Sequence, residues 1–500
     1  MKDILLGIDI GTSACKIVAF ETDGTVVTQV TMDYPVYYPK QGWAEQDPNQ
    51  WWEAICKGLK EVTKIVDSKA IKGIGIDGQS WSAIAIDKDG KVLCNTPIWM
   101  DTRSSEICQE LKETIGEDVL FAKSGNPLQP MYTQPKVHWY KKHMPEVYNN
   151  TYKILQSNSF IAYRLTDAVS QDPSQGYGWN CYDMEKGVWD TELCEKMGIN
   201  SSLLPNIVPC HQVVGTVTET SAKETGLEVG TPVVAGGLDA ACGTLGAGVI
   251  HSGETQEQGG QAGGMSICMQ ECKADKALIL GAHVVPDLWL LQGGTVGGGG
   301  VINWFEREFG HAERETAKAT GRSSFAEMDM IAKEIPAGSQ GLVFLPYMAG
   351  ERSPIWDANA KGVFYGIDFS KGRAHFMRAA MEGVAFSLRH NLEVANDAGA
   401  PVGVLSSMGG AANSKLWTQI KADITGKKII VPSSDTATAL GAAILAGVGT
   451  GIYNNFEEAV EKTVVIKKSY TPNPDNAEIY NQAYETYISL YKNLKPIMNK

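Results

Sequence analysis

The sequence lacks the patterns that mark membrane, secreted and zinc-binding proteins. No apolar run of the ~18 residues needed to cross a bilayer occurs among its 500 residues. Residues 1–20 contain no basic region, apolar core or small-residue cleavage site of a signal peptide. The ten cysteines form no CxxC pair, and Cys268 with Cys272 has neither a second pair nor histidines for zinc. We therefore interpret the cysteines as reduced, buried thiols and predict a cytoplasmic protein.

Positive charge is scarce. Lysine and arginine number 44 against 57 aspartates and glutamates, which gives a net charge of −13. An acidic surface repels nucleic acid and anionic lipid, so we predict neither nucleic acid nor a membrane as a partner. A phosphate ligand remains compatible with this charge, because backbone N–H groups and one or two local cations can hold it.

Several catalytic and repeat signatures are also missing. The chain has no GxSxG, HExxH or GxxxxGKS motif, and its eight histidines show no metal-ligand spacing. These absences argue against a hydrolase nucleophile elbow, a zinc protease and a P-loop. No fixed short period is present, which excludes solenoids and propellers.

The segments that are present predict an α/β protein. Residues 4–9, 15–20 and 25–27 read as three strands joined by hairpins. A dinucleotide-binding fingerprint would instead lead from its glycines into a helix. Residues 51–65 predict an amphipathic helix that follows Asp47-Pro48. Residues 476–494 predict a tyrosine-rich helix on the second domain.

The second half of the chain repeats features of the first. Residues 232–239 and 258–268 again combine apolar strands with turns of small residues. A chain of this length has room for two or three domains. We predict an internal duplication, with two similar α/β domains that face each other across a central cleft.

Glycine-containing loops end strands in both halves and together favour a nucleotide site. The turn after Asp9 could present N–H groups to a phosphate, with Lys16 nearby and Asp9 holding Mg²⁺ directly or through water. Each loop taken alone fits an ordinary turn equally well. The loops are the turn Gly11-Thr12-Ser13, residues 258–268, the glycine run 297–300 with Gly298 and Gly299, and residues 407–414.

Two further positions could contact a substrate. Asp239 is a lone carboxylate among small residues at the expected start of a helix, where a simple N-cap explains it as well as a catalytic base does. Most of the 12 tryptophans fit core positions. Trp81 is different because it follows the polar pair Gln79-Ser80 at a strand end, where a sugar could bind.

Four longer segments resemble one protein family. LLGIDIGTSACKIVAF, residues 5–20, resembles the first phosphate hairpin of the FGGY carbohydrate kinases, which belong to the actin/hexokinase-like superfamily. MYTQPKVHWYKKH, residues 131–143, and GVFYGIDFSKGRAHFMRAAME, residues 362–382, resemble the two signatures of that family. FLPYMAGERSPIWDANAKG, residues 344–362, is similar to the xylulose kinase branch. The resemblance covers nearly the whole chain in order.

The resemblance implies a fold and a set of site residues. The fold would consist of two duplicated actin/hexokinase-like (ribonuclease H-like) domains, with residues 1–246 binding the sugar and residues 247–500 the nucleotide. ATP and Mg²⁺ would be the cofactors, Asp239 the catalytic base and Asp9 the metal-associated carboxylate. A homodimer is also implied. The matching positions are Gly11, Thr12 and Ser13 in the phosphate-1 turn; Gly263, Gly264 and Ser266 in the phosphate-2 turn; Gly409, Gly410 and Asn413 in the adenosine loop; and Gln79, Ser80, Trp81, Asp101 and Arg103 near the sugar.

The leading function is therefore ATP-dependent phosphorylation of D-xylulose to D-xylulose 5-phosphate. Bacterial xylulose kinases usually carry Met-His-Gly where this chain has Ser80-Trp81-Ser82, which keeps other acceptors open: L-xylulose, ribulose, erythritol, another polyol, or gluconate. A third hypothesis is a sugar- and nucleotide-binding protein without turnover. Its support is Met265, which stands where we align a threonine of the phosphate-2 turn.

Overall fold

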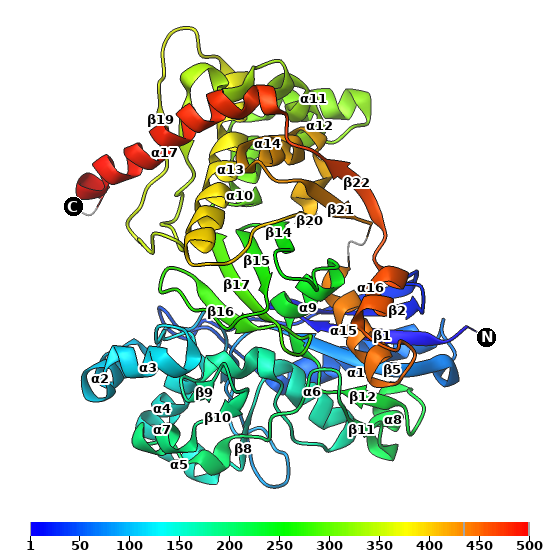
Figure 1. Ribbon diagram of the computed structural model, residues 1–500. Helices are drawn as coiled ribbons and strands as arrows, with labels where there is room; N and C mark the ends of the chain where they lie inside the picture. The colour runs from blue at the N-terminus through cyan, green and yellow to red at the C-terminus, as the bar shows by residue number, and fades with distance from the viewer. Residues whose placement is uncertain (1, 434–435, 499–500) are drawn as a thin grey trace.

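The computed structural model describes residues 2–433 and 436–498 and shows two α/β domains stacked on one another (Figure 1). Each domain is built on one seven-stranded mixed sheet that helices cover. The predicted fold class, with its actin/hexokinase-like pair of domains, is confirmed by this arrangement.

The first sheet begins with the predicted run of hairpins. Its strand order is β11-β12-β5-β1-β2-β3, and β13 pairs with the end of β5. β1 is antiparallel to β2 and parallel to β5. The strands are β1 (Ile4–Ile10), β2 (Ala14–Glu21), β3 (Val26–Asp33), β5 (Ile71–Gly78), β11 (Val213–Thr216), β12 (Pro232–Val234) and β13 (Gly237–Leu238).

The second sheet repeats this topology. Its order is β16-β17-β15-β14-β20-β21-β22. The hairpin pair β14-β15 corresponds to β1-β2, and β20 lies parallel to β14 as β5 lies parallel to β1. The predicted duplication is therefore present in the strand connections. The strands are β14 (Thr255–Gly259), β15 (Gly263–Met269), β16 (Ile279–Ala282), β17 (Trp289–Thr295), β20 (Leu405–Met408), β21 (Ile429–Pro432) and β22 (Ile466–Tyr470).

The helices of the first half include the one predicted after Asp47. Asp47 caps α1 by accepting a hydrogen bond from the Asn49 N–H, and Pro48 occupies the first helical position, where its missing N–H costs nothing. The helices are α1 (Pro48–Thr63), α2 (Ser105–Ile115), α3 (Glu117–Ser124), α4 (Thr133–His143), α5 (Pro145–Asn150), α6 (Ser157–Thr166), α7 (Thr191–Lys196), α8 (Glu219–Thr225) and α9 (Asp239–Gly246).

The helices of the second half end with the predicted tyrosine-rich segment. Tyr480, Tyr484 and Tyr487 of α17 are buried against the second domain, and the Tyr347 hydroxyl donates a hydrogen bond to the Tyr487 hydroxyl at 2.8 Å. The helices are α10 (Gly299–Phe309), α11 (His311–Thr320), α12 (Ser324–Lys333), α13 (Arg373–Asp397), α14 (Lys415–Thr425), α15 (Ala437–Gly449), α16 (Phe456–Thr463) and α17 (Ala477–Met498).

Helix α15 crosses back onto the first domain. It lies against β1 and β5, and Figure 1 shows α15 and α16 in orange beside the blue strands of the first sheet. A Cβ atom at Gly7 would lie 1.9 Å from the Ala439 carbonyl oxygen, and one at Gly75 would lie 1.8 Å from that of Ala442. Glycine at these positions lets the helix backbone touch the sheet. A helix from the second half of the chain thus covers part of the first sheet.

Smaller elements complete the chain. Four two-stranded pairs lie outside the main sheets: β4 (Glu45–Gln46) with β7 (Thr96–Pro97), β6 (Ile84–Ile86) with β8 (Lys153–Leu155), β9 (Tyr182–Asp183) with β10 (Val188–Trp189), and β18 (Val343–Leu345) with β19 (Val363–Tyr365). All ten cysteines are free thiols, and eight of them are buried. Across residues 2–433 and 436–498, no helix combines the length and apolarity that a membrane crossing requires.

Candidate active site

Three carboxylates gather where the central strands of the first sheet end. Asp9 of β1 is the direct neighbour of Asp77 on the parallel strand β5. Asp77 in turn pairs with Gly237 of β13, two residues before Asp239. Asp239 is the first residue of α9 and accepts a 2.6 Å hydrogen bond from the Ala240 N–H. The strand connections therefore bring together one sequence-predicted pair, Asp9 and Asp239, around a third acid.

The environment of Asp239 favours its protonated form. Removal from water raises the pKa of this carboxyl from 3.8 to about 7, with the negative charge of Asp9 adding to the rise and the Ala240 N–H opposing it. A carboxyl whose pKa lies near neutrality can both accept and release a proton at physiological pH. Leu238, not Asp239, is the N-cap of α9, so the plain N-cap explanation does not hold and the proton-transfer role of Asp239 stays a prediction.

The other two acids are also perturbed. Burial raises the pKa of Asp9, while neighbouring Asp77 and Lys16 partly offset the rise. Burial, followed by the charges of Asp9 and Asp239, raises the pKa of Asp77 well above its usual range. Neither oxygen of Asp77 has a hydrogen-bond partner in the part of the chain that the structure describes. Such an orphaned pair of oxygens next to Asp9 is a donor set that suits a hard cation.

The predicted phosphate-1 turn is the tight link between β1 and β2. The Gly11 N–H donates to the Ala14 carbonyl at 3.0 Å. Thr12 accepts a bond from the Trp99 indole at 3.0 Å, and its carbonyl accepts one from the Gln46 amide at 2.8 Å. Ser13 at the tip is exposed, and Lys16 is the cross-strand partner of Asp9. The turn therefore presents its tip to solvent beside a cation and a carboxylate.

A cavity of about 200 Å³ opens between the two domains. From the first domain it is lined by Ser80, Trp81 and Tyr177, and from the second by residues that include Gln256 and Gln292. Of the predicted sugar residues, Ser80 and Trp81 line this cavity, whereas Gln79 is buried behind them. The mixture of aromatic rings and amides is typical of a site for a small polar molecule.

Trp81 is held in an unusual conformation. Its φ of 56° lies in the left-handed region, which a bulky side chain rarely adopts. The ring makes edge contacts with Tyr132 and Tyr177, at centroid distances of 4.7 and 5.5 Å. The buried Lys136 ammonium donates to the Trp81 carbonyl at 2.8 Å and to the Ile98 carbonyl at 2.9 Å. Surrounding structure thus fixes the wall of the cavity against local strain.

Asp101 and Arg103 form an ion pair with each other and do not line this cavity. The Arg103 guanidinium bonds both oxygens of Asp101 and one oxygen of Glu45, at 2.8–3.0 Å. It also lies 3.9 Å from the ring centre of Trp43. Only 3% of the Arg103 side chain and none of that of Asp101 is exposed. The pair braces the loop before α2 and does not line the cavity, so direct contact of Asp101 and Arg103 with the sugar stays a prediction.

The phosphate-2 hairpin turns earlier than the sequence suggested. β14 ends at Gly259 and β15 begins at Gly263, so residues 260–262 form the tip. Gly263 and Gly264 open β15, and Ser266 lies further along it, where it accepts a bond from Gln292 at 3.1 Å. Because glycines occur within the tip and on both sides of it, at 259, 260, 263 and 264, the sequence alone does not show which of them form the turn. The aligned match of Gly263 to Ser266 with the turn itself is thus corrected by three residues.

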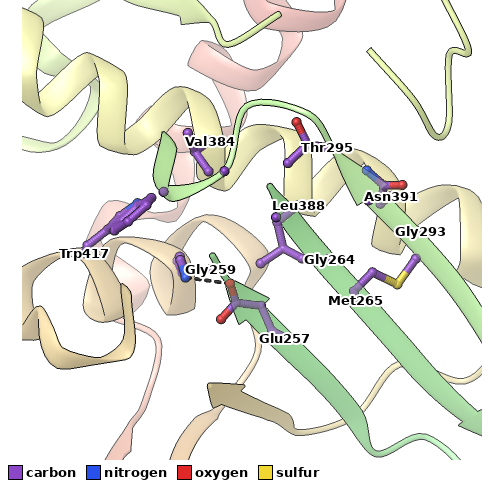
Figure 2. A pocket seen from close by; sticks show the side chains of 15 residues that line it. Glu257, Gly259, Gly264, Met265, Gly293, Thr295, Val384, Leu388, Asn391 and Trp417 are labelled. Atoms are coloured by element: carbon purple, nitrogen blue, oxygen red, sulfur yellow. Dashed lines mark hydrogen bonds and ion pairs between the residues drawn. The ribbon is translucent and has the colours of Figure 1, made fainter. Parts of the chain in front are cut away.

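Met265 is buried and adjoins two cavities, the one between the domains and a smaller one behind the second sheet. Its side chain lines a small cavity of about 20 Å³ between the second sheet and helices α13 and α14 (Figure 2). The Lys421 ammonium pairs with the buried Glu257 carboxylate there at 2.6 Å. Because the methionine side chain is buried, it replaces no phosphate ligand. The support for a protein without turnover disappears with this finding.

A second large cavity, of about 500 Å³, lies beside the predicted adenosine loop. Gly410 and Asn413 line it, together with Phe325, Met381 and Trp417. Gly409 adjoins the loop with a φ of 79°, which glycine adopts without strain. An apolar and aromatic pocket of this size fits a purine base and its ribose.

The glycine run at 297–300 serves close packing. A Cβ atom at Gly298 would lie 2.2 Å from the backbone of Ala262, and one at Gly299 would lie 2.6 Å from the Gly260 carbonyl oxygen. The start of α10 therefore presses directly on the tip of the phosphate-2 hairpin. Gly299 lines the 500 Å³ cavity as well, so its absent side chain also leaves room there.

Some site residues escaped the sequence analysis. Asp77 ends the strand that follows the first hairpin, but only the parallel pairing of β1 with β5 reveals that it faces Asp9. Tyr177 lines the domain cavity from a short 3₁₀ helix, Pro173–Gly178, and Arg352 lines it from a loop; neither segment has a periodicity that marks it in the sequence. A signal for Arg352 was present in the segment GERSP, where a cation follows a glycine turn.

Comparisons with known proteins agree with this geometry. Two models of the FGGY family of carbohydrate kinases match the chain, the N-terminal domain over residues 4–246 and the C-terminal domain over residues 265–450. A xylulose kinase of Staphylococcus epidermidis is 34% identical, with 99% of this chain and 98% of that protein covered. A gluconokinase of Bacillus subtilis is 30% identical, with 99% and 97% covered.

A solved structure shows the same fold throughout. The xylulose kinase of Rhodospirillum rubrum superimposes with a TM-score of 0.90 at 29% identity, covering 99% of this chain and all of that one. Two matching family models, full-length relatives and a solved structure of the same fold converge on one assignment. The chain belongs to the FGGY family of carbohydrate kinases and is an ATP-dependent sugar kinase.

Proposed function

We propose that the protein phosphorylates D-xylulose at its primary hydroxyl and produces D-xylulose 5-phosphate. Xylulose kinases are among its full-length relatives. The observation that carries the chemistry is Asp239, whose carboxyl has a pKa of about 7 and starts a helix beside the domain cavity. Among the described residues, only the Ala240 N–H donates a hydrogen bond to this carboxyl, so an acceptor hydroxyl can reach it.

In the proposed reaction, Asp239 accepts the proton of the attacking hydroxyl. The hydroxyl oxygen bonds to the γ-phosphorus as the bond to the β,γ-bridging oxygen breaks, and ADP leaves. The phosphate-1 turn and residues 260–263 supply N–H donors to the phosphates. Closure of the cleft would exclude water and limit ATP hydrolysis.

Mg²⁺ is the metal that this site fits. Magnesium usually keeps several waters and binds one or two carboxylates together with substrate phosphates. Asp9, with Asp77 beside it, supplies such a partial shell, and no complete set of three metal-binding side chains exists among the described residues. The bound ion would neutralise charge on the phosphates. Asp9 would hold it, and Lys16 would balance the remaining negative charge.

The sugar would bind against Trp81 and Ser80 on the first-domain side, with Gln256 and Gln292 opposite. Gln79 supports this wall, because its amide donates to Gln46 at 2.8 Å. Gln46 in turn bonds the Thr12 carbonyl. These two hydrogen bonds connect the cavity wall at Ser80 and Trp81 to the phosphate-1 turn. Binding of the sugar at the wall would therefore order the turn, and binding of a phosphate at the turn would order the wall.

A second candidate substrate is a sugar acid such as gluconate, or another ketose or polyol. Two observations favour it: Ser80-Trp81-Ser82 departs from the sequence usual in bacterial xylulose kinases, and a gluconokinase is a full-length relative at 30% identity.

We also propose that the protein is a cytoplasmic homodimer. In each subunit, residues 1–246 would bind the sugar and residues 247–500 the nucleotide. Light scattering on the purified protein tests the dimer.

The test of function is sugar-dependent ADP release in a coupled assay with Mg-ATP. The panel contains D- and L-xylulose, D- and L-ribulose, fructose, glycerol, xylitol, erythritol and gluconate. We expect D-xylulose to have the highest kcat/KM, and Asp239→Ala to lower kcat by ~10²–10⁴-fold. A higher kcat/KM for gluconate would refute the D-xylulose assignment. Near-normal turnover of Asp239→Ala would refute its role as the base.

A further inference from the structure

Arg352 stands out as a cation whose guanidinium makes no hydrogen bond or salt bridge among the described residues, with the Glu351 carboxylate as its neighbouring charge. It lies in the loop between β18 and β19, and its side chain is exposed to the cavity between the domains. Among the described residues lining that cavity it is the only cation, and no carboxylate lines the cavity with it. Arginine in a cleft is normally paired, so this one is poised for an anion.

The residues on either side of Arg352 are fixed in place. Glu351 accepts hydrogen bonds from the Val296 N–H at 2.8 Å and from the Thr295 hydroxyl. Ser353 accepts one from the Gly294 N–H at 2.6 Å. Both anchors attach the loop to the end of β17. The backbone that carries Arg352 is therefore rigid, while its guanidinium makes no hydrogen bond to the described residues.

This fixation places the guanidinium over the phosphate-2 hairpin. A Cβ atom at Gly294 would lie 3.2 Å from Arg352 Nη2 and 2.9 Å from the Gly263 carbonyl oxygen. Gly263 and Gly264 line the same cavity as Arg352, as do Ser80 and Trp81 on the opposite wall. Any anion that bridges the hairpin and the sugar wall would therefore meet this side chain.

We propose that Arg352 binds the γ-phosphoryl group of ATP and stabilises its charge during transfer. The planar fork of arginine matches two phosphoryl oxygens, and burial within the cleft strengthens the interaction. Burial also lowers the pKa of Arg352, with Glu351 opposing the change, and arginine stays charged at neutral pH. Arg352 would thus complement the N–H donors of residues 260–263.

This role rests on the proposed function only in that ATP is the phosphoryl donor; it is independent of which sugar is the acceptor. The same fork could instead hold a carboxylate of a sugar acid. Both ligands share one chemistry, an oxyanion with two coplanar acceptors. The experiment below separates them.

Calorimetry compares the binding of Mg-ADP, Mg-β,γ-imido-ATP and gluconate to wild type, Arg352→Gln and Arg352→Lys. We expect Arg352→Gln to lose about 10- to 100-fold in affinity for the imido analogue and to keep its affinity for ADP. Its kcat should fall ~10³-fold. Arg352→Lys should retain part of both, because it keeps the charge but not the fork. Arg307→Gln is the matched control, since Arg307 is exposed on α10 and pairs only with Glu308.

An unchanged ratio of the two nucleotide affinities in Arg352→Gln would overturn the proposal. Loss of gluconate binding alone, with both nucleotides unaffected, would assign Arg352 to a carboxylate and overturn it as well. Failure of D-xylulose as a substrate refutes the proposed acceptor, while the nucleotide comparison still decides the role of Arg352.

Discussion

Replacement of Asp239 by asparagine should make the protein more stable and nearly inactive. Asparagine keeps the oxygen that accepts from the Ala240 N–H but cannot take up the acceptor's proton. We expect kcat to fall ~10²–10⁴-fold. In wild type, kcat/KM should decline below about pH 7 as the Asp239 carboxylate becomes protonated.

The gain in stability follows from the cost of ionising a desolvated carboxyl. A pKa of about 7 in the folded protein against an ordinary 3.8 corresponds, at 1.36 kcal/mol per pH unit, to about 4 kcal/mol. The side chain is only half-buried, so solvent screening reduces this to roughly 1–3 kcal/mol. At roughly 2 °C per kcal/mol for a domain of this size, Tm at pH 8 should rise by several degrees.

The stability gained by Asp239→Asn should depend on pH in a direction that can be tested. Because the pKa of Asp239 is raised on folding, its stabilising contribution is complete below pH 3.8 and is lost as the pH rises through about 7. The advantage of Asp239→Asn should therefore be largest at pH 8 and shrink by pH 5. Differential scanning calorimetry at fixed scan rate measures it, with Asp89→Asn in an exposed turn as control. An advantage that is absent at pH 8, or that grows toward pH 5, refutes the reasoning.

Three further substitutions test the assigned roles. Arg103→Lys should lower the free energy of unfolding by about 3 kcal/mol, because the buried Asp101 carboxylate loses its two-pronged partner; denaturant titration measures it, and the sugar KM should stay within about twofold. Gly75→Ala should destabilise by at least about 3 kcal/mol, since its Cβ would lie 1.8 Å from the Ala442 carbonyl oxygen; the soluble yield and thermal midpoint report it. Met265→Thr should destabilise by about 2 kcal/mol and leave the KM for ATP unchanged in the coupled assay.

Each of these has a control or a contrary outcome. A raised sugar KM in Arg103→Lys, with normal stability, would support direct contact with the sugar. Gly410→Ala is the control for Gly75→Ala, because a Cβ at Gly410 meets no atom within 4 Å. A large change in the ATP KM of Met265→Thr would contradict the packing of that side chain behind the sheet.

Much of the architecture could be predicted because local signals agreed with the final fold. Alternating apolar residues and tight turns marked the first hairpin, and Asp47-Pro48 marked the start of α1. The duplication was visible because glycine turns between apolar strands occurred twice. Asp239 was identifiable as a lone carboxylate among small residues, although its raised pKa depends on burial in the fold and then on Asp9, 230 positions earlier in the sequence.

The remainder depended on long-range packing that no local pattern encodes. The position of the phosphate-2 turn was obscured because glycine occurs at 259, 260, 263 and 264, and each could begin or end a strand. Arg103 was assigned to the sugar because the sequence does not show that Glu45, nearly sixty residues away, is one of its partners. Arg352 was overlooked for the opposite reason, since only the fold shows that its side chain lines the domain cavity and makes no salt bridge with the residues that the structure describes.

Helix α15 has a consequence for how the protein is made. The ribosome makes the residues of β1 and β5, on which this helix packs, early in synthesis. The helix itself begins only at Ala437, about 190 residues after α9 ends. At roughly 5–20 residues per second, ribosomes need roughly 10–40 s to supply it. Throughout that interval the nascent first domain displays an apolar sheet face without its cover. The first domain therefore begins synthesis first but completes folding late, and the growing chain is a natural client for chaperones that bind at the ribosome exit.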